Sequence, residues 1–143
     1  MKKMTYWMGL LMAVVVVACG PSYDQTVDIG TIENQMKYDT NRIQASPGDT
    51  IKINLKNNAT MSIMKHNLVI LSSQDAIEDI GTAAVKAPNY LPSDDRILAA
   101  SELLGPGEST SLVVTVPSEP GTYPYICTFP GHYQVMQGII IVK

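Results

Sequence analysis

Residues 122–142 read Thr-Tyr-Pro-Tyr-Ile-Cys-Thr-Phe-Pro-Gly-His-Tyr-Gln-Val-Met-Gln-Gly-Ile-Ile-Ile-Val, and they carry the strongest indication of the fold. Residues 122–127 and 138–142 have the composition of strands, and a turn-forming Pro-Gly pair lies between them. The joining segment also holds a thiol, an imidazole and a thioether, which belong to Cys127, His132 and Met136. Because such side chains bind soft metals, the stretch predicts two strands connected by a metal-ligand loop.

The centre of the chain adds further strands. Every second residue of 51–55 is apolar, which is typical of a strand with one buried face, and Ser-Pro-Gly-Asp at 46–49 supplies the preceding turn. Residues 66–71 and 111–116 also have strand composition. Together with the two strands described above, this spacing predicts an all-β fold, a Greek-key β-sandwich.

One segment departs from this pattern. Residues 74–104 have mixed polarity and contain Pro88 and Pro92, which break regular structure. A short helix is expected near residues 75–85. We interpret the whole segment as a short, partly helical excursion between strands of the sandwich.

The N-terminus has the pattern of an export signal. Lys2 and Lys3 precede an apolar run over residues 8–18, which is too short to cross a membrane comfortably. Val-Val-Ala-Cys at 16–19 resembles the lipobox of bacterial lipoproteins, which implies a lipid on Cys19; the alternative is a plain signal peptide with a chance cysteine. The expected organisation is a lipoprotein signal peptide (1–18), a lipid-anchored tether (19–28) and one domain (29–143). The anchored protein is expected to face the periplasm or the cell exterior.

Charge and motif content exclude several classes of function. Loss of Lys2 and Lys3 with the signal would change the formal net charge from −3 to −5, and no basic cluster is present, so nucleic acid is not an expected partner. The chain has no glycine-rich phosphate-binding loop and neither a GxSxG nor an HExxH motif. With Cys19 used as the anchor, Cys127 has no disulfide partner in an exported chain, so its thiol requires another explanation.

The residue types that accompany Cys127 select copper. The chain contains two histidines, His66 and His132, and Met136 follows in the loop. Two imidazoles, one thiolate and one weak thioether form the ligand set of blue copper centres, in which the soft sulfur ligands stabilise Cu(I). Zinc is the competing metal, although a structural zinc site normally takes four Cys or His ligands. Taken singly, each of these residues is more often an ordinary core or loop residue.

The loop from Cys127 to Met136 resembles that of azurin, the bacterial cupredoxin, with the spacing C-x4-H-x3-M, whereas plastocyanin-like loops are shorter. The resemblance covers most of the mature chain, including Asn-Gln-Met at 34–36, Met-Lys-His-Asn at 64–67 and Tyr-Leu-Pro at 90–92. The chain is also similar to auracyanin, an azurin-like, membrane-associated cupredoxin. The resemblance implies one copper ion per chain, bound by His66, Cys127, His132 and Met136.

The same resemblance assigns supporting residues. It implies that Asn67 ties the two ligand-bearing segments together, as outer contacts commonly do in metal sites. It also implies an apolar patch around the exposed edge of His132, where redox partner proteins dock. The residues of this patch are Met36, Met64, Phe129, Pro130 and Gly131.

These features predict a one-electron carrier with type 1 copper in an extracytoplasmic electron-transfer chain, and no enzyme activity. A nitrite reductase needs a second, histidine-rich copper, and a binuclear copper module needs two cysteines in the loop; the chain has residues for neither. The alternatives are a non-redox copper-binding lipoprotein for storage or delivery, and an adhesion domain with incidental metal. Reversible one-electron voltammetry would distinguish a carrier from a store.

Overall fold

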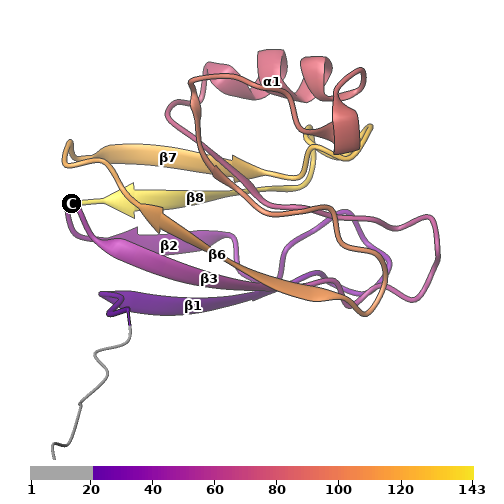
Figure 1. Ribbon diagram of the computed structural model, residues 1–143, viewed down its shortest axis with the longest axis horizontal. Coiled ribbons are helices and arrows are strands. Elements are labelled where there is room, and N and C mark those ends of the chain that lie inside the picture. The colour runs from indigo at the N-terminus through magenta and orange to yellow at the C-terminus, as the bar shows by residue number, and fades with distance from the viewer. Residues whose placement is uncertain (1–20) are drawn as a thin grey trace, which may run out of the picture.

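The computed structural model describes residues 21–143, which form a sandwich of two β-sheets (Figure 1). The predicted signal peptide and Cys19 lie outside the described residues. The elements are β1 Gln25–Gly30, β2 Arg42–Ala45, β3 Thr50–Lys56, β4 Val69–Leu71, α1 Ala76–Ala84, the 3-10 helix η1 Pro88–Tyr90, β5 Ile97–Ala100, β6 Ser109–Thr115, β7 Gly121–Ile126 and β8 Gln137–Val142. Neither helix of this part of the chain has the length and hydropathy that a membrane crossing requires.

The chain crosses repeatedly between the two sheets. One sheet has three strands in the order β1-β3-β6, and the other has five in the order β2-β8-β7-β4-β5. β1 and β2 run parallel to their partners β3 and β8, whereas the other strand pairs are antiparallel. Because the chain changes sheet after β1, β2, β3, β5 and β6, loops that are distant in sequence meet at the same end of the sandwich.

The core between the sheets follows from alternating apolar residues. Ile51, Ile53 and Leu55 of β3 are at most 1% exposed, and they share one buried cluster with Tyr125 of β7 and Ile140 of β8. Burial of each large apolar side chain contributes about 1.5–3 kcal/mol. This core holds the two sheets together and supports the loops at both ends.

The predicted sandwich is confirmed, with differences at the strands that sequence patterns mark weakly. Strands β3, β6, β7 and β8 lie where they were predicted, and α1 forms within residues 75–85. The predicted strand over residues 66–71 is shorter, because His66 pairs with Leu104 only as an isolated bridge. Within residues 74–104, β5 returns to the five-stranded sheet as an edge strand beside β4.

Two strands precede the first one that the sequence predicted. β1 begins at Gln25, ahead of the expected domain start at residue 29, because it pairs with β3 and directs Val27 and Ile29 toward the core. β2 carries Ile43 and Ala45 on its buried face and lies beside β8. Residues 25–28 therefore belong to the folded part of the chain, and the division into signal peptide and tether stays a prediction.

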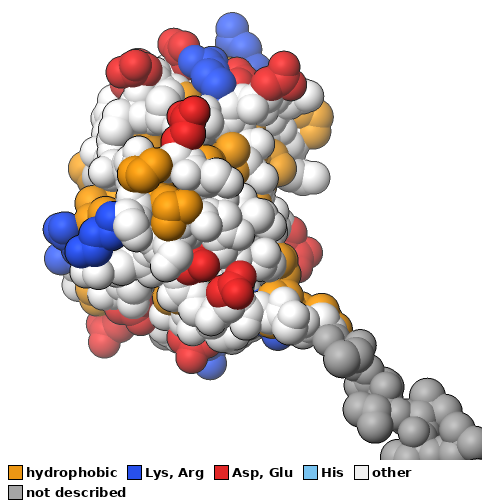
Figure 2. Space-filling model, turned by 90° about the vertical axis from the view of Figure 1, so that its left-hand side faces the viewer, with side chains coloured by type: hydrophobic (Ala, Val, Ile, Leu, Met, Phe, Trp, Pro, Cys, Tyr) orange, Lys and Arg blue, Asp and Glu red, His pale blue; other side chains and the backbone are white. Residues whose placement is uncertain are grey.

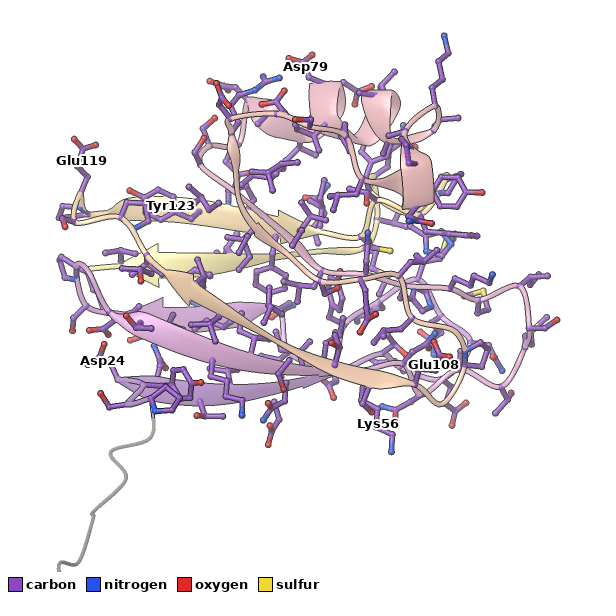
Figure 3. All side chains as sticks on the ribbon, in the orientation of Figure 1. Asp24, Lys56, Asp79, Glu108, Glu119 and Tyr123 are labelled. Atoms are coloured by element: carbon purple, nitrogen blue, oxygen red, sulfur yellow. The ribbon has the colours of Figure 1, made fainter. Side chains whose placement is uncertain are left out.

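The two ends of the sandwich carry different loops. Asp24, Glu119 and Tyr123 mark one end in Figure 3, where β1 begins and the C-terminus lies. Lys56 and Glu108 mark the other end, which contains the loops that follow β3 and β7. Figure 2 views the first end, whose surface carries side chains of both charges among scattered apolar ones.

Candidate metal centre

The predicted metal ligands converge at the end of the sandwich that lies opposite the start of β1 (Figure 1). His66 lies in the segment between β3 and β4, Cys127 directly follows β7, and His132 lies in the loop that leads to β8. All three side chains are buried, and their ligand atoms lie within 4.8 Å of one another. The fold thus joins one histidine from a distant segment to the Cys-His loop.

The ligand atoms have the spacing that a shared metal ion requires. Nδ1 of His66 and Nδ1 of His132 are 3.2 Å apart, and the Cys127 sulfur lies 3.8 Å and 3.6 Å from these two nitrogens, respectively. Nitrogen and sulfur ligands sit about 2.0–2.3 Å from a bound metal, which puts neighbouring ligand atoms about 3–4 Å apart. The triangle therefore fits one metal ion, and its composition is the His₂Cys set of blue copper sites.

His66 is held by its backbone and is directed to the cluster by burial. Its N–H donates to Leu104 O at 3.1 Å, and its carbonyl accepts from Leu104 N at 2.8 Å. Its ring is 0% exposed, and its Nε2 atom is the one buried side-chain nitrogen or oxygen without a hydrogen-bond partner among the described residues. Burying a polar atom without a partner is costly, so another interaction must justify the position of the ring, and its Nδ1 atom is the one that meets Cys127 and His132.

Burial sets the protonation states of the three side chains. It lowers the pKa of His66 to about 4, with a further contribution from His132, and it also lowers the pKa of His132. Burial raises the pKa of Cys127 to about 11, although the backbone amides of Asn67 and Phe129 act in the opposite direction. The imidazoles are therefore neutral near pH 7, as metal ligands must be, and the thiolate form of Cys127 needs a nearby cation.

Met136 lies beside Cys127 in the closed ligand loop. Cys127 N–H donates to Met136 O at 3.1 Å, and Met136 N–H donates to His132 O at 2.8 Å. The Met136 side chain is 0% exposed and belongs to the main core cluster together with Cys127. The four residues form a cluster that is consistent with one type 1 copper.

Asn67 joins the two ligand segments, as the resemblance implied. Its side-chain amide donates to Thr128 Oγ1 at 2.8 Å, and its side-chain oxygen accepts from Thr128 N at 2.8 Å. Tyr38 OH donates to Asn67 O at 2.5 Å. Sequence reasoning missed Tyr38 and Thr128, because a bond to a backbone carbonyl and a bond across the fold have no signature in local sequence. These contacts fix the chain next to His66 and next to Cys127.

Phe129 of the predicted apolar patch contacts His132, and all five residues of the patch are at least partly exposed. Met36 is 42% exposed, Gly131 is exposed, and Met64, Phe129 and Pro130 are half-buried. The Phe129 ring packs edge-on against His132, with ring centroids 5.0 Å apart. Further large apolar side chains that the sequence did not mark are exposed nearby in the chain, namely Met61, Ile63 and Val135.

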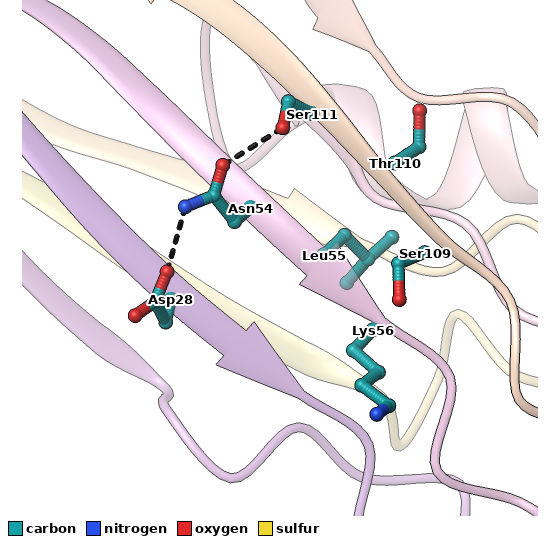
Figure 4. Close-up of a pocket in the computed structure, with 7 residues that line it drawn as sticks. All are labelled: Asp28, Asn54, Leu55, Lys56, Ser109, Thr110 and Ser111. Atoms are coloured by element: carbon teal, nitrogen blue, oxygen red, sulfur yellow. Dashed lines mark hydrogen bonds between the residues drawn. The ribbon is translucent and has the colours of Figure 1, made fainter.

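A groove elsewhere on the surface is a weaker candidate for a site. It lies on the outer face of the three-stranded sheet and is lined by Asp28, Asn54, Leu55, Lys56, Ser109, Thr110 and Ser111 (Figure 4). Asn54 donates to Asp28 at 2.7 Å and accepts from Ser111 at 2.8 Å. Because these polar groups satisfy one another across the strands, the groove offers no comparable set of converging ligands.

Comparisons with known proteins agree with the geometry. Residues 25–143 match the model of the copper binding proteins of the plastocyanin/azurin family. The chain is 35% identical to Auracyanin-A of Chloroflexus aurantiacus, over 92% of this chain and 91% of that protein, and 32% identical to an azurin of Pseudomonas fluorescens biotype C, over 77% and 92%. A crystal structure of reduced auracyanin from Roseiflexus castenholzii superposes with a TM-score of 0.76 at 34% identity, covering 87% of this chain and 99% of that one.

Proposed function

The chain belongs to the plastocyanin/azurin family of copper-binding proteins, and on that premise we propose that His66, Cys127, His132 and Met136 are the ligands of its copper. The protein is a type 1 copper protein that carries electrons and is not an enzyme. One observation carries the ligand assignment: two imidazole Nδ1 atoms and one cysteine sulfur meet within 4.8 Å in a buried site. We propose that the protein carries its electrons outside the cytoplasm, as an auracyanin-like protein.

The ligand residues suit electron transfer more than substrate chemistry. Copper supplies the one-electron change between Cu(I) and Cu(II) when bound. The sulfur of Cys127 and that of Met136 favour Cu(I), and the two imidazoles serve both oxidation states. The side chains of the site are at most 5% exposed, so a substrate has little access to them. Hydrogen bonds between Asn67 and Thr128 keep the ligand segments in one arrangement for both oxidation states.

We infer that electrons enter and leave through His132. Its ring retains 5% exposure, whereas that of His66 has none. The patch of Met36, Met64, Phe129, Pro130 and Gly131 around it would be the docking surface for redox partner proteins. Electron-transfer complexes are small and short-lived, and a compact apolar contact without strong ion pairs suits rapid separation.

The decisive experiment is an absorption spectrum of the copper-loaded protein, followed by voltammetry. We expect an intense visible band from charge transfer between the Cys127 thiolate and Cu(II), which dithionite bleaches, and a reversible one-electron wave. A copper store would bind the ion without a reversible wave at accessible potentials. A Cu(II) form without the visible band would refute the ligand assignment.

We also propose that the mature protein is held at a membrane by a lipid on Cys19. The geometry supports such a tether, because β1 starts at the end of the sandwich opposite to His132 and leaves the docking patch facing away from the anchor. Membrane-extracted protein should have a mass that begins at Cys19 plus lipid, and should show no tryptophan emission, because the only tryptophan, Trp7, is removed. The Cys19→Ser variant should appear in the soluble fraction. A wild-type protein that retains Trp7 would contradict this proposal.

A further inference from the structure

Tyr133 lies on the side of the ligand loop opposite to the copper ligands. Met136 and Cys127 belong to the main core between the sheets. Tyr133 belongs instead to a second buried cluster on the outer face of the five-stranded sheet, together with Val69, Leu71, Ala76, Ile80 and Ile126. Helix α1 covers this cluster and lies above β7 in Figure 1, with Asp79 marking its outer face in Figure 3. The loop is therefore packed from both sides.

The contact between α1 and Tyr133 is close and depends on a glycine. A Cβ atom on Gly81 would lie 2.3–2.5 Å from Tyr133 ring atoms, which is too short for any real contact. Glycine in the middle of a helix is unfavourable, so Gly81 carries a conformational cost that the close contact offsets. The Tyr133 hydroxyl donates to Glu78 Oε1 at 3.0 Å, one turn earlier on the same helix.

The loop backbone is fixed at the same residue. Tyr133 O accepts from Gln137 Nε2 at 2.7 Å. Immediately before Tyr133, the carbonyl of His132 accepts from Met136 N at 2.8 Å. A shift of the Tyr133 ring would therefore move the turn that connects His132 to Met136.

We propose that Tyr133 is a positioning residue of the copper site: seated on Gly81 and bonded to Glu78, it holds His132 in place from the outside of the fold. The proposal rests on the ligand assignment made above. Asn67 fixes the start of the loop at Thr128, and Tyr133 fixes its second half, so the two anchors lie on either side of His132. Helix α1, which joins β4 to β5 outside the sandwich, thereby supports the ligand loop of the metal centre.

The test compares two substitutions on one helix. Gly81→Ala favours helix formation but displaces the Tyr133 ring, whereas Ala83→Gly weakens the helix at an exposed position that leaves the ring alone. We expect Gly81→Ala to release copper to a chelator about 10-fold faster and to move the thiolate band and the reduction potential. Ala83→Gly should lower the midpoint of thermal unfolding. It should leave the rate of copper release, the thiolate band and the reduction potential unchanged.

A second variant keeps the test decisive if Gly81→Ala does not fold. Tyr133→Ala removes the ring and the hydroxyl, and should also release copper about 10-fold faster. In the double variant, Gly81→Ala should add little to Tyr133→Ala, because the Cγ, Cδ1 and Cδ2 atoms of Tyr133 that a Cβ atom on residue 81 would meet are then absent.

Failure of the positioning role and failure of the ligand assignment are distinguishable. If the wild-type protein has no thiolate band, the ligand assignment itself is refuted. If the wild-type band is present and Tyr133→Ala leaves release, band and potential unchanged, the role of Tyr133 is refuted. Equal acceleration of copper release by Ala83→Gly and by Gly81→Ala would also refute it, because helix stability alone would then explain both.

Discussion

Replacing Cys127 with serine should abolish the visible band of the copper-loaded protein. A serine hydroxyl is a hard oxygen donor that cannot supply the low-energy sulfur electrons from which the charge transfer starts, and it binds Cu(I) poorly. Copper affinity should fall by more than the roughly 100-fold that loss of an outer contact can cost. The variant should still fold, because serine is slightly smaller than the buried Cys127 side chain that it replaces.

The measurements are an absorption titration with Cu(II) and a competition with a chelator of known affinity. Thr122→Ser serves as the matched control, because Thr122 lies exposed on the same strand, β7. The control should keep the wild-type band. A Cys127→Ser variant that retains an intense band would show that another group is the sulfur ligand.

The metal-free protein should be most stable between about pH 6.5 and pH 9, with losses on both sides. On the acid side, burial lowers the pKa of His66 to about 4 in the folded protein, below its ordinary value of 6.5. Between these values the unfolded chain binds a proton that the folded protein does not, so the free energy of unfolding rises with pH. At 1.36 kcal/mol per pH unit, about 2–3 kcal/mol should be lost on acidification to pH 4.

On the alkaline side, the free energy of unfolding changes with pH in the opposite direction. Burial raises the pKa of Cys127 to about 11 from 9.0, so the folded protein keeps a proton that the unfolded chain releases, and stability falls as pH rises through this window. Urea unfolding followed by circular dichroism at pH 4.5, 7.5 and 10, with a chelator present, measures the loss of stability on the acid side and on the alkaline side. Cys127→Ser should keep the loss on the acid side and reduce the loss on the alkaline side. Part of the alkaline loss should remain, because burial also raises the pKa of Tyr38 and of Tyr125 above the ordinary value of 10.0. Equal stability at pH 4.5 and 7.5 would contradict the account of His66.

The candidate site was largely predictable because its main signal is local. Cys127, His132 and Met136 lie in one loop, between two strands whose composition is recognisable by itself. His66 could be added because the chain has only two histidines and because of the resemblance to azurin, although His66 and Cys127 are 61 residues apart in sequence. The alternation in β3 likewise revealed its buried face, since each strand repeats its pattern every two residues.

Other features were decided by the tertiary structure alone. β2 and β5 are four residues long, too short for alternation to stand out, and they are strands because β8 and β4 offer them partners. The bond from Tyr38 to Asn67 spans 29 residues and the bond from Tyr133 to Glu78 spans 55. Sequence patterns report which face of an element is buried, because that depends on a residue's own hydropathy and spacing. They cannot report which two buried surfaces meet, because that depends on how the whole chain packs.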